Sequence, residues 1–84
     1  MKPVIAADAL VAHLQDEVVI LHAGTKDYFR LNATGQTVWR LIERGLELDE
    51  MVAAVVGEYE VSPEAARADV LRLLDELRAA GLVQ

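Results

Sequence analysis

The spacing of apolar residues changes once along this chain, at about residue 32. Before that point, β-branched and aromatic residues gather in two short runs, 17–22 and 28–31, separated by the turn-forming segment 23–27. This arrangement predicts two antiparallel strands joined by a hairpin loop of about four or five residues. From Asn32 onward the apolar residues recur every three or four positions, which is the spacing of a helix. A strand therefore leads into a helix with almost no loop.

The N-terminal part gives weaker strand signals. Residues 3–6 are expected to form a short edge strand, because proline is tolerated at the first position of a strand. Residues 10–15 fit either a strand or a turn. Together with the hairpin, these signals predict a sheet of three strands.

Alternation divides the side chains of the strand at 28–31 between two faces. Phe29 and Leu31 are expected to face the core, with Tyr28 and Arg30 on the opposite face. The backbone along the outer edge of this strand then remains available to a partner.

Two helices are expected next, at about 33–44 and 48–58. Asn32 is a favourable N-cap for the first, and Gly45 suits the left-handed backbone that ends a helix. The second is expected to be weakly capped, because Glu47 stands where serine, threonine or aspartate is preferred.

The third helix has the strongest end signals and the widest apolar face. Ser62 is its expected N-cap, Pro63 its first residue and Gly81 its stop. One broad arc carries most of its apolar side chains: Ala66, Val70, Leu73, Leu74 and Leu77, with Leu71 at the far edge. A small core does not require so wide an arc from one helix.

Three strands followed by three helices, the last two joined by a short connection, indicate an α+β fold of winged-helix-turn-helix type. In this fold a three-stranded antiparallel sheet precedes the helices. The sequence contains no repeat, linker or low-complexity segment. Residues 1–84 are therefore expected to form a single domain.

Composition narrows the functional classes. The chain has no cysteine, which excludes thiolate catalysis, disulfides and cysteine-ligated metals. No apolar run approaches the ~18 residues of a membrane span and no signal segment is evident, so a cytoplasmic protein without membrane contact is expected. Eight Lys plus Arg against 14 Asp plus Glu give a net charge of −6. That charge suits a neutral or basic partner better than a phosphate backbone.

Catalysis has little support in the sequence. The only histidines are His13 and His22, and no serine or carboxylate completes a recognisable nucleophile–base set. Two isolated histidines do not make a metal site, and no glycine-rich phosphate loop is present. A protein without enzymatic activity, metal or cofactor is therefore expected, and His22 is interpreted as a residue at the end of a strand.

Two other functions of small proteins fit less well. The fold type permits DNA binding. This alternative is weaker, because acidic residues on the third helix offset the positive charge of its arginines. The residues concerned are Arg67, Arg72, Arg78, Glu64, Asp69, Asp75 and Glu76. An acyl-carrier role would need a serine in an Asp-Ser-Leu context, whereas Ser62, the only serine, lies in Val-Ser-Pro.

A peptide-binding module fits best. An extended peptide can add a strand to an open sheet edge while its side chains enter a groove beside a helix. Asp69 and Glu76 flank the edge of the apolar arc at Leu73, and they favour a basic peptide. Val70 and Leu77 are expected to serve mainly as core residues that also floor the groove, and Leu73 suits the core and the groove equally.

Three segments of the sequence resemble the PqqD family, whose members are small precursor-peptide recognition domains in the modification of ribosomally made peptides (RiPPs). They are Leu-Asn-x-x-Gly-x-x-x-Trp from Leu31, Leu-Asp-Glu-Met-Val from Leu48, and Asp-x-x-x-x-Leu-x-x-Leu-x-x-x-Gly-Leu from Asp69. The resemblance covers about residues 15–83. One departure is Glu47, where the family pattern has a small hydroxyl residue, and it bears on helix capping rather than on binding.

The resemblance implies a non-catalytic protein that captures the leader segment of a precursor peptide and delivers it to modifying enzymes. In such domains the leader pairs antiparallel with the third strand and lies against the third helix. Carried over to this sequence, the peptide-binding set is Asp27, Tyr28, Phe29, Arg30, Leu31, Asp69, Val70, Leu73, Glu76 and Leu77.

The resemblance leaves two biosynthetic settings open. Lasso-peptide biosynthesis, with a leader peptidase and an ATP-dependent cyclase as partners, is favoured because the short free-standing form is common there. Quinone-cofactor synthesis, with a radical-SAM enzyme as partner, is the alternative. Lasso leaders carry an aromatic residue and a proline a few residues apart, plus basic residues, which suits an apolar groove with acidic flanks.

Overall fold

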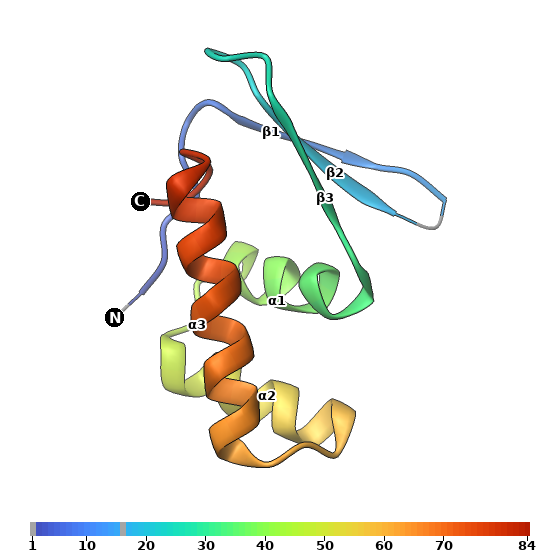
Figure 1. Cartoon of the computed structure of the whole chain (residues 1–84), viewed down its shortest axis with the longest axis vertical. Coiled ribbons are helices and arrows are strands. Elements are labelled where there is room, and N and C mark those ends of the chain that lie inside the picture. Colours follow the sequence, from blue (N-terminus) through green and yellow to red (C-terminus); the bar gives the residue numbers. More distant parts are fainter. Residues whose placement is uncertain (1, 16) are drawn as a thin grey trace.

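The sheet is an antiparallel meander whose strands follow one another in sequence order, and three helices lie to one side of it (Figure 1). The computed structural model describes residues 2–15 and 17–84. Its elements are β1 (Ala9–His13), β2 (Val18–His22), β3 (Tyr28–Leu31), α1 (Ala33–Glu43), α2 (Leu48–Tyr59) and α3 (Pro63–Ala79). This order confirms the predicted α+β fold, in which a three-stranded antiparallel sheet precedes three helices.

The first strand lies further along the chain than predicted. Residues 3–6 do not join the sheet, and Ile5 instead forms an isolated antiparallel bridge with Val83. The strand is Ala9–His13, which overlaps the segment whose pattern fits either a strand or a turn. The local pattern indicates extended backbone at 3–6 but does not indicate which segment pairs with it, because Val83 lies at the opposite end of the sequence.

Side-chain caps begin α1 and α3 where the sequence predicts them. The Asn32 Oδ1 atom accepts a hydrogen bond from the Gly35 backbone N–H at 2.8 Å. Likewise, the Ser62 Oγ atom accepts one from the Ala65 N–H at 3.1 Å. Each cap satisfies a backbone donor that has no partner within the helix, so the chain leaves β3 and enters α1 without a loop.

The prediction that Glu47 caps α2 only weakly is wrong. The Glu47 backbone N–H donates to Glu50 Oε1 at 2.8 Å, and the two residues form a capping box. A glutamate thus takes the place of the serine or threonine that usually begins this motif. At its other end α2 runs one residue beyond the predicted boundary, to Tyr59.

A left-handed glycine ends α1, as predicted. Gly45 has φ of 77°, and the Leu46 N–H donates back to the Leu41 C=O at 3.3 Å. This pattern is the Schellman motif, which satisfies the last carbonyls of a helix and turns the chain. α3 ends in the same way at Gly81, with φ of 75°.

The core lies between the inner face of the sheet and the helices. Its largest fully buried side chains are Trp39, Ile20, Met51, Leu74, Leu77, Leu82, Val38 and Val70. From β3, Leu31 is buried and Phe29 packs half-buried against this cluster. Tyr28 is 67% exposed and Arg30 is also exposed, which confirms the predicted division of the strand between two faces.

The opposite face of the sheet is largely apolar. Leu10 lies opposite Leu21, which in turn lies opposite Tyr28. We call this surface the outer sheet face; it comprises Leu10, Ala12, Leu14, Glu17, Val19, Leu21, Tyr28 and Arg30. Its two charged residues, Glu17 and Arg30, form an ion pair at 3.9 Å. An antiparallel sheet with one face in water usually carries polar residues there, so this face is unusual.

Candidate peptide-binding groove

β3 is an edge strand, and its hydrogen bonds to β2 are made by alternate residues. The His22 N–H donates to the Asp27 C=O at 2.8 Å, which marks these opposed residues as a hydrogen-bonded pair. Such pairs alternate with non-bonded pairs along an antiparallel ladder. In the observed register the next bonded positions on β3 are Phe29 and Leu31, whose backbone groups point toward β2.

The remaining backbone groups of β3 point toward its open edge. They are the N–H and C=O of Tyr28 and of Arg30, because these residues occupy the non-bonded positions of the β2–β3 ladder. Within residues 2–15 and 17–84, no strand lies on that side of β3. A strand edge of this kind is a template for pairing with another chain.

A groove with a volume of about 280 Å³ lies between the first half of α1 and the middle of α3. Its lining residues are Asn32, Thr34, Gly35, Val38, Val55, Asp69, Val70, Arg72, Leu73 and Glu76. Val38, Val55 and Val70 are buried core residues and form its apolar floor. Leu73 is half-buried, so its side chain belongs to both the core and the groove wall.

Gly35 keeps the groove next to β3. A Cβ atom at this position would lie 3.2 Å from Leu31 Cδ2 and 3.2 Å from Asn32 Oδ1, closer than an ordinary van der Waals contact. The missing side chain therefore lets the first turn of α1 rest against the end of the strand. As a result, a chain paired with the edge of β3 would continue past the mouth of the groove.

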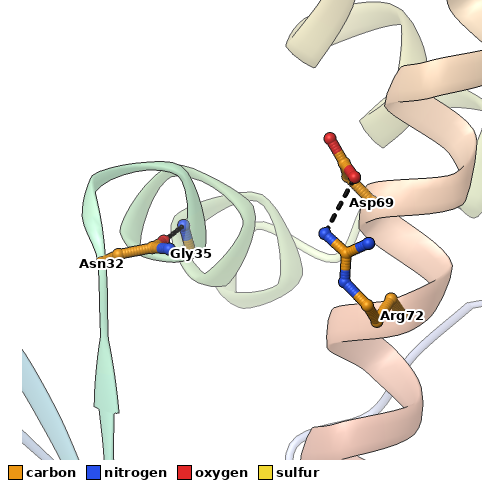
Figure 2. Close-up of polar contacts among 4 residues, drawn as sticks. All are labelled: Asn32, Gly35, Asp69 and Arg72. Carbon is orange, nitrogen blue, oxygen red and sulfur yellow. Dashed lines mark hydrogen bonds and ion pairs between the residues drawn. The ribbon is translucent and has the colours of Figure 1, made fainter.

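The polar groups of the groove lie on opposite sides of it. Figure 2 shows Asn32 and Gly35 at the start of α1, and Asp69 with Arg72 across from them on α3. Arg72 Nη2 donates to Asp69 Oδ1 at 2.9 Å. Glu76, one turn further along α3, is exposed, and its carboxylate has no ion pair or hydrogen bond to the described residues.

The structure places four of the ten predicted site residues in the lining of the groove and the other six outside it. Residues 27–31 form the strand edge and the turn before it, while Asp69, Val70, Leu73 and Glu76 line the groove. Leu77 is fully buried and does not line the groove, so it supports the wall from the core side.

Residues 17–83 match the family described as coenzyme PQQ synthesis protein D (PqqD). The chain belongs to the PqqD family. Among solved structures, it is similar to TbiB1 in complex with the TbiA(beta) leader peptide, with 36% sequence identity and a TM-score of 0.92. That match covers 96% of this chain and 94% of the other.

A second solved structure shares the fold of this PqqD-family chain. It is lasso peptide synthetase B1 complexed with the leader peptide, with 21% identity, a TM-score of 0.93, and coverage of 100% of this chain and 99% of the other. Comparison with curated proteins gives no match.

Sequence reasoning missed six lining residues of this PqqD-family groove: Asn32, Thr34, Gly35, Val38, Val55 and Arg72. The sequence indicates only capping and helix packing for Asn32, Gly35 and Val38. Arg72 has a usable signal, because it lies three residues after Asp69 and four before Glu76, on the same side of a helix. Val55 has none, because only the packing of α2 on α3 brings it there.

The described residues of this PqqD-family chain contain no group of three or more His, Cys, Asp and Glu side chains able to hold a metal ion. None of the helices in that part of the chain is long and apolar enough to cross a membrane.

Proposed function

We propose that this chain captures the leader segment of a ribosomally made precursor peptide, without catalysing a reaction itself. The observation that carries this proposal is the open edge of β3 beside a groove that has an apolar floor and charged walls. The leader adds antiparallel to β3 as a fourth strand, and its backbone pairs with the outward groups of Tyr28 and Arg30. Its side chains on the inner face then enter the groove, which supplies sequence preference.

The proposed setting is lasso-peptide biosynthesis. It is supported by the similarity to TbiB1, which is described in complex with a leader peptide. A lasso peptide synthetase component with the same fold, also in complex with a leader peptide, adds support. In this setting the protein with its bound leader passes the precursor peptide to a leader peptidase and an ATP-dependent cyclase. In the alternative setting, quinone-cofactor synthesis, the corresponding partner is a radical-SAM enzyme.

Delivery requires a surface that an enzyme can contact while the leader is bound. The outer sheet face is suited to this role, because Leu10, Leu14 and Tyr28 are each more than half exposed on it. Exposed apolar patches of this kind mark interaction sites. The face also adjoins the edge of β3, so a partner docked there would lie beside the bound leader.

Isothermal titration calorimetry tests the capture of the leader. The titrant is a synthetic leader segment of the precursor peptide encoded beside this chain's gene, and we expect a dissociation constant in the micromolar range or below. No binding by any leader encoded there would refute the proposed function.

The variant Leu73→Arg tests whether the peptide occupies the groove. We expect about tenfold weaker leader binding, since the substitution puts a charged side chain into the wall of an apolar groove. Leu71→Arg is the matched control, because Leu71 is also half-buried on α3 but does not line the groove. Circular dichroism would show whether each variant remains folded. If Leu73→Arg unfolds the protein and Leu71→Arg does not, Leu73 acts as a core residue and the groove assignment is wrong.

A further inference from the structure

The two acids of the groove differ in their partners. Asp69 Oδ1 lies 2.9 Å from Arg72 Nη2, so its charge is already compensated by a cation on the same helix. Glu76 has no such partner among the described residues, because Arg72, the cation four residues before it on the same side of the helix, pairs with Asp69. The groove therefore carries one uncompensated negative charge, and that charge is on Glu76.

We propose that Glu76 selects a single cationic side chain, lysine or arginine, in the bound leader. Arg72 limits the selection to one cation, since it neutralises Asp69 and repels a second positive charge. This inference rests on the proposed function, and it names the chemistry of the peptide that the groove prefers.

The spacing of the groove residues gives the preference a sequence form. Leu73 and Glu76 lie three residues apart on α3, which places their Cβ atoms about 5–6 Å apart on one face of the helix. Alternate side chains of an extended peptide project from the same face, about 6.5–7 Å apart. A leader that sets an apolar side chain against Leu73 thus presents its basic residue to Glu76 when one residue separates the two.

The local pairing, rather than the net charge of the protein, determines this preference. A net charge of −6 attracts any basic peptide weakly and without regard to sequence. A direct contact with Glu76 differs because the bound peptide covers the pair and excludes water from it. A charge-assisted hydrogen bond in such a position is stronger than an exposed ion pair.

A double-mutant cycle separates the contact from the general attraction. Fluorescence anisotropy would measure binding of the labelled leader segment, in its native form and with each basic residue changed singly to glutamine. We expect Glu76→Gln to weaken binding of the native peptide about threefold to tenfold. The same substitution should have less than a twofold effect on the one peptide that lacks the selected basic residue.

Two further variants serve as controls for charge. Asp75→Asn removes the same charge from the neighbouring position, outside the groove, and should change affinity less than twofold. Arg72→Gln should strengthen binding about twofold to fivefold, because it releases Asp69 and removes the repelling cation.

The outcomes distinguish this inference from the proposed function. If the unmodified protein binds no leader peptide, the proposed function fails. If it binds, but Glu76→Gln matches Asp75→Asn or weakens every peptide equally, the leader is captured without a cation contact at Glu76. The inference about Glu76 is then wrong while the proposed function stands.

Discussion

At the scale of single residues, a partly buried contact between two hydroxyl groups joins two helices. Thr37 of α1 is the only buried polar side chain in the described part of the chain, at 6% exposure. Its Oγ1 atom lies 2.7 Å from the Tyr59 hydroxyl at the end of α2, and Arg40 Nη2 donates to it at 3.4 Å. A polar contact in this position fixes the last turn of α2 against α1.

Removing the Tyr59 hydroxyl should therefore destabilise the fold. We expect Tyr59→Phe to lower the free energy of unfolding by about 1 kcal/mol, the typical net contribution of one hydrogen bond. Urea denaturation followed by circular dichroism would measure it. Tyr28→Phe is the matched control, because Tyr28 is 67% exposed, and it should change stability by less than about 0.5 kcal/mol. Equal effects of the two substitutions would contradict the assigned contact.

His22 illustrates what a sequence pattern leaves undetermined at this scale. The pattern indicates a residue at the end of a strand, and His22 does end β2. Its Nδ1 atom also accepts hydrogen bonds from the N–H groups of Gly24 and Thr25, both at 3.1 Å, and so organises the hairpin loop. The side chain makes this contact only after the loop has folded back, so no spacing in the sequence indicates it.

At the scale of elements, most boundaries follow from local chemistry. The caps at Asn32 and Ser62 and the glycine stops at Gly45 and Gly81 depend on residues within a few positions of one another, so the sequence is sufficient to predict them. The position predicted for the first strand is wrong for the opposite reason. Apolar residues near the N-terminus indicate extended backbone, whereas their partners are decided by contacts across the whole fold.

Two glycines should respond in opposite ways to alanine. Gly45→Ala should cost about 1–2 kcal/mol, because Gly45 has φ of 77° and an L-residue is strained there. Gly57→Ala should stabilise by about 0.5–1 kcal/mol, since Gly57 lies inside α2 and a Cβ atom added there would meet no atom within 4 Å apart from its chain neighbours and the backbone of its own helix. Thermal unfolding of both variants provides the measurement, and shifts of the same sign would contradict this account.

At the scale of the whole molecule, the sequence indicates part of the lining of the candidate groove but not all of its walls. The α3 residues Asp69, Leu73 and Glu76 are predictable because they share one side of a helix. Gly35 and Val55 join them only when α1 and α2 pack against α3, and that packing involves residues far apart in the sequence. A sequence pattern therefore locates one wall of the groove, and the fold supplies the other.

The proposed delivery role can be tested apart from capture. Leu10→Glu places a charge in the middle of the outer sheet face, and we expect at least fivefold slower leader cleavage by the purified leader peptidase of the same pathway. Leader affinity measured by calorimetry should stay within twofold, because the groove is unchanged. Ala53→Glu adds the same charge at an exposed position of α2 and is the control. Normal cleavage with Leu10→Glu would exclude this face as the docking surface.

The pairing of the two ends of the chain has a mechanical consequence. The Ala6 N–H donates to the Leu82 C=O at 2.9 Å, and the Gln84 N–H donates to the Val4 C=O at 2.7 Å, on either side of the Ile5–Val83 bridge. Because the two segments run antiparallel, both free ends lie at the Val4–Gln84 end of the pairing. A force that pulls the two termini apart therefore opens these bonds one after another, beginning with the bond between Gln84 and Val4, rather than loading them together in shear. Stretching in an optical trap should therefore open this terminal pairing at low force, before the rest of the fold unfolds. The sheet and the groove would carry load only after it has opened.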